Sequence, residues 1–521
     1  MQAHNTELTR RASMEFAGMA AVGLPMMALG GSTVAQPADV RAGPAPDAAR
    51  TFPDGFYWGT GTSSYQIEGA WNEDGKGPSI WDTYAHAPGN IKDGDTGDIA
   101  NDHYHRYKED VALMKEIGAN AYRFSISWPR IFPNGTGPPN AKGLDFYNRL
   151  VDELVAAGIA PFSTLYHWEL PQALQDKGGW QNRDTVKAFA DYAGYMAEKL
   201  SDRVRHFFTI NEFRSFVDMG HQAKEVLIPG GTVTLSGAPG LKLPPGELNQ
   251  VRHHSVLAHG MAVQAIRAKG KAGTKVGPAE VILCSVPLIE TAEHIRAAEV
   301  ATREVNAPFL TVMLEGKYTD LYLKDAGKDA PKFTDEDLKI IASPLDFVGI
   351  NVYKPEAYVL AADQPPGWRQ ISYAKGHPML SSRWHTMAPE SMYWAPKFAQ
   401  SLWGAKEIHI TENGCATQDV IADDGRIYDT DRIMFLRNYL TQLQRATAEG
   451  VPVRGISTGA RWTISSGPQA SETVLGWCMS TSKRRSARRN SAPHSSMRRR
   501  NVTRSREARH RSKCRSEGRL R

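Results

Sequence analysis

The chain has 521 residues, of which 41% are hydrophobic, so it has ample apolar surface to bury in a large core. No stretch after the N-terminus reaches the roughly 20 apolar residues that span a bilayer, and the four widely spaced Cys give no disulfide framework. The formal charge of +6 is uneven: residues 483–521 carry 16 basic and 2 acidic side chains, which leaves the preceding 482 residues at −8. The body of the protein is therefore acidic, and only its tail is basic.

The first 35 residues have the features of an export signal. Thr9-Arg10-Arg11 precedes an apolar run over residues 16–29, and small residues around Val34 offer a cleavage site. Paired arginines before a mild apolar run resemble a twin-arginine signal, the route of bacterial proteins that are exported already folded. We therefore expect a periplasmic or secreted protein with a Pro- and Ala-rich linker over residues 36–50. The alternatives are an ordinary secretory signal or a disordered extension, and without a signal the protein would be cytoplasmic.

From residue 51 onward, short β-rich runs alternate with amphipathic helical windows. This rhythm is typical of a parallel sheet with helical crossovers. Eight such repeats predict an α/β fold of the closed (β/α)8 TIM-barrel class over residues 51–460. The predicted strands are 56–61, 121–128, 161–166, 206–211, 275–283, 346–351, 408–412 and 453–457. Predicted helices include 104–117, 143–157, 184–200, 250–268 and 430–448.

Two glutamates close predicted strands and are the strongest candidates for chemistry. Glu212 ends the run Phe207-Phe208-Thr209-Ile210-Asn211-Glu212, and Glu412 lies in Ile408-His409-Ile410-Thr411-Glu412-Asn413-Gly414. The carboxyl ends of the strands form the reactive face of such a barrel. Two carboxyls that meet there suit the hydrolysis of a sugar acetal, because one donates a proton to the leaving oxygen while the other attacks or activates water. The alternative is a pair of surface or salt-bridged glutamates.

Several motifs together resemble glycoside hydrolase family 1, the β-glucosidases. The resemblance covers residues 52–455, in order and in register with the predicted strands. The motifs that carry it are Phe52-Pro53-Asp54-Gly55-Phe56-Tyr57-Trp58-Gly59 with Ser63-Ser64-Tyr65-Gln66-Ile67-Glu68-Gly69-Ala70-Trp71, then Tyr122-Arg123-Phe124-Ser125-Ile126-Ser127-Trp128-Pro129-Arg130, Thr164-Leu165-Tyr166-His167-Trp168-Glu169-Leu170-Pro171, Gly349-Ile350-Asn351-Val352-Tyr353 and the two glutamate runs.

The resemblance implies a retaining β-glycosidase that works by double displacement. Glu212 would be the acid/base and Glu412 the nucleophile, with their carboxyl groups ~5–5.5 Å apart. Arg123 and Tyr353 would keep Glu412 ionised and aimed. The residues expected to bind the sugar are Gln66, His167, Trp168, Asn211 and Asn351. As alternatives, His167 and Trp168 could only fill the barrel interior, and Arg123 could form a structural ion pair.

The chain departs from the family pattern in two places. Phe213 stands where a proline usually follows the acid/base glutamate, which predicts a shifted loop after the fourth strand with Glu212 itself in place. After Gly455 the family would continue with W-S-x-x-D-N-F-E-W, whose Glu and Trp bind sugar hydroxyls. Suitable codons for Ile456 onward, read two bases later, spell IYWSTMDNFEWAAG and more of the family ending. This indicates a frameshift, so we expect an incomplete or abnormal eighth strand and a basic, disordered tail over residues 461–521.

The expected substrate is a small β-glucoside or a cello-oligosaccharide, cut at its terminal non-reducing β-D-glucosyl residue. No cofactor, metal, nucleic-acid or membrane partner is expected after export, because the His residues lack ligand spacing and the basic tail has no interleaved aromatics. The altered C-terminus predicts weak or lost activity. One alternative is therefore an inactive sugar-binding remnant. Another is a 6-phospho-β-glycosidase, because that class shares most of these motifs. The sequence does not indicate an oligomeric state.

Overall fold

The computed structural model describes residues 51–459, apart from 92–93, 229–230, 375, 382–384, 418–419, 421 and 425, together with residues 474 and 475. The predicted export signal (1–35) and linker (36–50) lie outside the described residues, as does the predicted tail (461–521) apart from that last pair. Within the described part of the chain, no helix is both long and apolar enough to cross a membrane.

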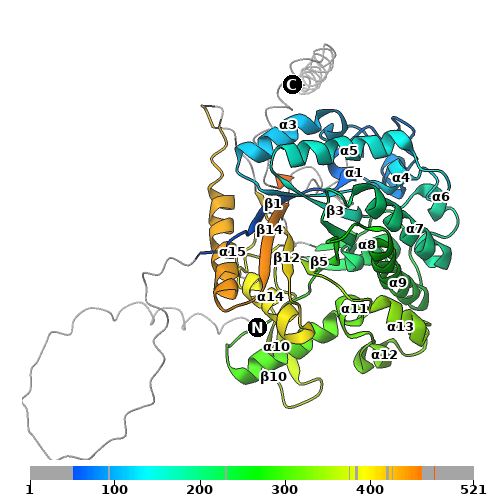
Figure 1. The fold of residues 1–521 in the computed structure, drawn as a ribbon. Coiled ribbons are helices and arrows are strands. Elements are labelled where there is room, and N and C mark those ends of the chain that lie inside the picture. The colour runs from blue at the N-terminus through cyan, green and yellow to red at the C-terminus, as the bar shows by residue number, and fades with distance from the viewer. Residues whose placement is uncertain are drawn as a thin grey trace, which may run out of the picture. The chain divides into compact units, whose positions relative to one another are not determined.

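Eight parallel strands close into a barrel, which confirms the predicted fold class (Figure 1). Every predicted strand is present, and each end lies within three residues of its predicted position. In order around the barrel the strands are β1 (Tyr57–Gly61), β2 (Ala121–Ser125), β3 (Ala160–Tyr166), β4 (His206–Asn211), β7 (Lys275–Val281), β9 (Val348–Asn351), β12 (Ile408–Asn413) and β14 (Val453–Gly459).

The eighth barrel strand, β14, pairs with both of its neighbours. Tyr57 and Gly61 of β1 lie opposite Gly455 and Gly459, and Asn413 of β12 lies opposite Thr458. Over the described residues, the eighth strand is therefore not incomplete, contrary to the expectation from the sequence. Gly455 lets β14 approach β1 closely at this point, because it has no side chain. A Cβ on Gly455 would lie 2.6 Å from the Cβ of Tyr57.

Helices follow most barrel strands and cover the outside of the barrel (Figure 1). The amphipathic patterns predicted five of the long ones, and α10 and α14 were not predicted. The long helices are α3 (His103–Glu116), α5 (Ala141–Ala156), α7 (Arg183–Leu200), α9 (Pro245–Lys269), α10 (Ala292–Val305), α14 (Ser391–Trp403) and α15 (Thr430–Ala448). The shorter ones are α1 (Ser64–Ile67), α2 (Ile80–His86), α4 (Trp128–Ile131), α6 (Gln172–Gln175), α8 (Phe213–His221), α11 (Val312–Glu315), α12 (Asp320–Ala326) and α13 (Asp335–Ile341).

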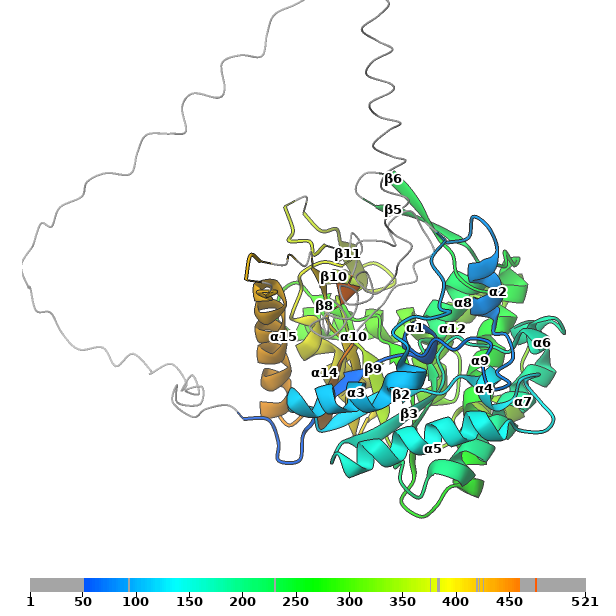
Figure 2. The same cartoon turned by 90° about the horizontal axis from the view of Figure 1, so that it is seen from above.

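Three small sheets lie outside the barrel. The hairpin β5 (Lys224–Ile228) and β6 (Gly231–Leu235) projects from the body in Figure 2. A three-stranded sheet joins β8 (Ser285–Pro287), β10 (Ala357–Ala361) and β11 (Trp368–Ile371). The last sheet pairs β13 (Ala416–Thr417) with β15 (Val474–Leu475), so two residues of the predicted disordered tail form a short strand.

Apolar side chains form two separate cores. The larger one packs between the strands and the surrounding helices. The smaller one fills the inside of the barrel with residues that alternate with the outward-facing ones along each strand. It consists of Ala121, Phe162, Phe208, Ala279 and Phe347. Because this inner core fills the barrel, the polar residues at the carboxyl ends of the strands sit on a packed base.

Candidate active site

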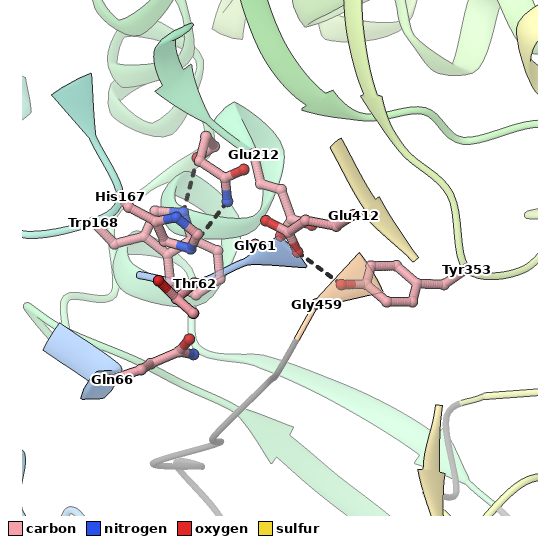
Figure 3. Close-up of a pocket in the computed structure, with 10 residues that line it drawn as sticks. Gly61, Thr62, Gln66, His167, Trp168, Glu212, Tyr353, Glu412 and Gly459 are labelled. Carbon is pink, nitrogen blue, oxygen red and sulfur yellow. Dashed lines mark hydrogen bonds between the residues drawn. The ribbon is translucent and has the colours of Figure 1, made fainter. Parts of the chain in front are cut away.

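A pocket of ≈370 Å³, which includes solvent at its mouth, opens where the carboxyl ends of the barrel strands converge (Figure 3). Both predicted catalytic glutamates line it. The two residues are 200 positions apart in the sequence: Glu212 directly follows β4 and Glu412 is on β12, and both enter the same space. Among the described residues, those that line it are Gly61, Thr62, Gln66, His167, Trp168, Asn211, Glu212, Tyr353, Glu412 and Gly459.

Glu412 is held by two donors, one on each carboxylate oxygen. Arg123 Nη1 lies 2.9 Å from Oε1, and the Tyr353 hydroxyl donates to Oε2 at 2.7 Å (Figure 3). The Arg123 side chain is 2% exposed and that of Glu412 is 13% exposed, so little water screens the ion pair. A cation and a hydroxyl donor both favour the ionised form of a carboxyl group. The two contacts therefore fix the orientation of the Glu412 carboxyl group at the pocket.

Glu212 occupies a different environment, at the junction between β4 and α8. It is the N-cap residue of α8, and its backbone is left-handed with φ 47°. This conformation is costly for a residue with a side chain and is commonly found at functional sites. The Glu212 N–H donates to the Ala279 carbonyl at 2.7 Å, and the Asn351 amide donates to its Oε1 at 2.9 Å. Arg123 thus places a cation beside Glu412, and Asn351 places an amide donor beside Glu212.

Arg123, Asn211 and Asn351 form a hydrogen-bonded floor that links the two glutamates. Arg123 Nη2 donates to Asn211 Oδ1 at 2.6 Å, and Asn351 Nδ2 donates to the same oxygen at 3.2 Å. Arg123 and Asn351 do not line the pocket. Asn351, predicted to bind sugar, is fully buried and instead contacts Glu212.

The remaining predicted sugar-binding residues lie in the pocket wall. Asn211 Nδ2 and His167 Nε2 are 3.2 Å apart, and the Trp168 indole N–H donates to the Asn211 carbonyl at 2.8 Å (Figure 3). Gln66, from α1 directly after β1, lies on the same wall. The pocket therefore has an aromatic ring, two side-chain amides and an imidazole beside the carboxyl groups. Apolar and hydrogen-bonding groups of these kinds suit the faces and hydroxyls of a sugar ring.

Sequence reasoning missed two threonines that support this floor. Thr164 Oγ1 accepts from Arg123 Nε at 3.0 Å, and the Thr411 hydroxyl donates to Asn351 Oδ1 at 2.6 Å. Both residues lie inside the quoted motifs, but nothing in a single strand shows which neighbour its side chain meets across the barrel. The pocket also includes Gly61, the last residue of β1, and Thr62 directly after it, which carry no chemical signal of their own.

A group of titratable side chains lies near the start of β4 and β12, at the opposite end of the barrel from the pocket. The possible ligand atoms of His206, Glu407 and His409 are within 4.8 Å of one another. Lys275 Nζ is 2.5 Å from Glu407 Oε2, and His409 Nε2 is 3.0 Å from Oε1. Although burial raises the pKa of Glu407, hydrogen bonds from these three cationic or imidazole neighbours hold it well below its usual value. Ion pairing accounts for this cluster, and we assign no metal to it.

The family model for glycosyl hydrolase family 1 matches residues 48–465, most of the chain. The chain belongs to this family. The resemblance predicted over residues 52–455 is thereby confirmed, and family 1 membership makes the two-glutamate pocket the expected site of hydrolysis.

Relatives named as glucosidases or glucohydrolases are similar to this chain over most of their own length. A 1,4-beta-D-glucan glucohydrolase of Thermotoga neapolitana is 42% identical over 410 residues, which are 78% of this chain and 92% of that protein. Beta-glucosidase A of Acetivibrio thermocellus is 43% identical over 413 residues, 78% of this chain and 88% of that protein. A solved beta-glucosidase from Thermotoga maritima in complex with glucoimidazole superimposes with a TM-score of 0.71 at 38% identity, covering 82% of this chain and 93% of that one.

Proposed function

We propose that this protein is a retaining β-glucosidase that removes terminal non-reducing β-D-glucosyl residues. The observation that carries the proposal is the contrast between the two glutamates in one pocket. Arg123 and Tyr353 donate to Glu412, and the Asn351 amide donates to Glu212. Such a division of environments lets one carboxyl stay ionised while the other holds a proton. Relatives named as β-glucosidases support the same activity.

In the first step the Glu412 carboxylate attacks the anomeric carbon, and the bond from that carbon to the leaving oxygen breaks. Glu212 gives its proton to the leaving oxygen, so the aglycone departs as a neutral alcohol or phenol. In the second step water attacks the glucosyl-enzyme ester. Glu212 takes the proton of the water, and Glu412 leaves as the carboxylate. Two inversions at one carbon retain its β configuration.

The hydrogen-bonded floor contributes alignment to both steps. Asn211 is held by Arg123 and lies at the pocket wall, where its amide can reach the 2-hydroxyl of a bound sugar. Contacts to this hydroxyl strengthen as the oxocarbenium-like transition state forms. We propose that Gln66, His167 and Trp168 bind the other hydroxyls and the face of the glucose. Small β-glucosides and cello-oligosaccharides are the proposed substrates.

The direct test is hydrolysis of an aryl β-glucoside, with the anomer of the first-formed glucose read by NMR. We expect β-glucose from the native chain and a fall in kcat of roughly 10⁴-fold or more for Glu412→Gln, because the amide is a far poorer nucleophile. Inverted product would overturn the retaining mechanism. Equal rates for native and variant would show that the pocket does not catalyse the reaction. Cleavage of the 6-phosphoglucoside alone would favour the phosphoglycosidase alternative.

We further propose that residues from Ile456 onward limit the rate of this chain. They replace the family segment whose Glu and Trp contact sugar hydroxyls, although Gly459 still lines the pocket. The test compares this chain with a version that carries the family segment in the alternative reading frame. We expect the restored version to have the higher kcat/KM on the same aryl β-glucoside. Equal values would overturn the proposal, and binding without turnover by the present chain would mark it as a sugar-binding remnant.

We also propose that the protein is exported folded, since Arg10 and Arg11 precede a mild apolar run. Fractionation of a bacterial host that has the twin-arginine machinery tests this. The native chain should reach the periplasm, and a variant with both arginines changed to lysine should stay in the cytoplasm. Identical fractionation of the two chains would exclude this route.

A further inference from the structure

A third buried carboxyl group lies next to Glu212, on the neighbouring barrel strand. Glu280 is on β7 and is 1% exposed. The preceding residue, Ala279, accepts the Glu212 backbone N–H at 2.7 Å. The pairing of β4 with β7 is irregular between Phe208 and Asn211, and beyond this shift Asn211 lies opposite Ala279. Glu280 is therefore placed at the point where β4 ends and the chain turns into α8.

The Glu280 carboxyl group contacts the backbone on the far side of Glu212. The Phe213 N–H donates to Oε2 at 2.5 Å, and the Arg214 N–H lies 3.4 Å from Oε1. Both N–H groups belong to the first turn of α8, where no partner within the helix is possible. The backbone of Glu212 is thus bonded on both sides to adjacent residues of one strand, by Ala279 before its side chain and by Glu280 after it.

This contact depends on Phe213, the residue that departs from the family pattern. A proline at this position has no N–H to donate, and its ring fixes φ. Phe213 has the N–H and lacks the ring. The left-handed backbone of Glu212 is costly and persists only where neighbouring contacts hold it. In this chain, the Glu280 carboxyl group supplies such a contact in place of a proline ring.

The groups around Glu280 act on its pKa in opposite directions. Burial raises the pKa of Glu280 well above its usual value, against the opposing effects of Arg214 and the two N–H groups, and Glu212 raises it further whenever that carboxyl is ionised. The Arg214 guanidinium itself donates to the Val305 carbonyl at 2.5 Å and lies 3.8 Å from Asp218. A neutral carboxyl still accepts an N–H through its carbonyl oxygen.

We propose that Glu280 is a positioning residue for the reaction: its bond to the Phe213 N–H fixes the backbone of Glu212 and thereby aims the acid/base carboxyl at the leaving oxygen. This inference rests on the proposed function of Glu212. It assigns to Phe213 and Glu280 together the alignment that a proline would otherwise provide.

The test uses two aryl β-glucosides, one with an activated dinitrophenol leaving group and one with a phenol of high pKa. Only the second needs a well-placed proton donor. For Glu280→Leu we expect kcat/KM to fall roughly 10- to 100-fold on the unactivated substrate, the scale of a small misplacement, and much less on the activated one. Glu280→Gln keeps an amide oxygen for the Phe213 N–H and should restore most of the native ratio between the two substrates.

The matched control is Glu169→Gln, which changes another fully buried glutamate that contacts Ser64 and Ser127 rather than the Glu212 backbone. This variant should change kcat/KM on both substrates by the same factor. If Glu280→Leu lowers kcat/KM by the same factor on both substrates, Glu280 is a structural residue only and the proposal fails. The proposal also fails if the ratio of kcat/KM between the two substrates is the same in every variant as in the native chain.

A second measurement does not need turnover. The melting temperatures of the native chain, Glu280→Leu, Phe213→Pro and the double variant form a thermodynamic cycle. We expect the Glu280 change to cost several degrees in the native background and clearly less in the F213P background, where the N–H is already gone. Additive losses would overturn the proposal. A chain with strong coupling but no hydrolysis of either substrate would contradict the proposed function and leave the Phe213–Glu280 contact supported.

Discussion

Individual side chains at the site act in pairs that span the barrel. Glu412 depends on Arg123 from β2 and Tyr353 from the segment after β9, and Glu212 depends on Asn351. Each glutamate could be recognised in the sequence because it closes a β-rich run. Its partners could be recognised only through the family motifs, since a single run does not show what lies across the barrel.

Loss of one donor to Glu412 should be measurable without loss of the charge pair. Tyr353→Phe removes the hydroxyl that donates to Oε2 at 2.7 Å. A hydrogen bond to a charged group contributes ~1.5–3 kcal/mol, so we expect kcat/KM on an aryl β-glucoside to fall roughly 10- to 100-fold. The control is Tyr104→Phe, which removes a tyrosine bond to Asp74 outside the pocket. Similar losses in both variants would contradict a specific role for Tyr353.

Among the secondary-structure elements, the barrel strands could be predicted from the sequence, whereas some helices and the small sheets between them could not. The strand ends agree with the pattern because buried parallel strands are short apolar runs bounded by turn residues. The helix α14 escaped prediction, and it contains Pro396. The β5–β6 hairpin and the small β8–β10–β11 sheet lie outside the alternating pattern. The role of Glu280 needs the register between β4 and β7, which no single segment encodes.

The β1–β14 contact gives a prediction about stability. Gly455→Ala places a Cβ 2.6 Å from the Cβ of Tyr57 and 2.9 Å from its carbonyl oxygen. Overpacking of this kind costs about 1–3 kcal/mol, so urea should unfold the variant at a lower concentration than the native chain. Gly459→Ala on the same strand is the control, because the nearest atom to its added Cβ is 4.0 Å away. Equal midpoints for the two variants would show that this contact is not tight.

For the whole molecule, buried titratable groups predict how stability varies with pH. Burial, opposed by Lys76 and reinforced by Glu68, raises the pKa of Glu169 to about 7 from 4.5. The native state therefore keeps a proton that the unfolded chain releases, and stability falls as pH rises from 4.5 to 7, by about 3 kcal/mol at most. Burial lowers the pKa of His221 and His253 to about 4, so these two residues reduce stability as pH falls from 6.5 to 4.

Glu169→Gln isolates the first effect, since the amide does not titrate. We expect the melting temperature of the variant, relative to the native chain, to rise between pH 5 and pH 7.5. The two histidines contribute equally to both proteins and cancel in this difference. A difference that is constant across the range would show that Glu169 is ionised throughout.

The seam between β1 and β14 brings together residues 399 positions apart, because the Thr458 hydroxyl donates to the Gly59 carbonyl at 3.5 Å. Contacts between such distant positions form slowly, because closing the intervening chain costs entropy before the contact can stabilise the fold. This seam should therefore be among the last contacts to form when the chain refolds. A protease added during refolding would then cut beside β1 and β14 after the strands opposite them have become protected.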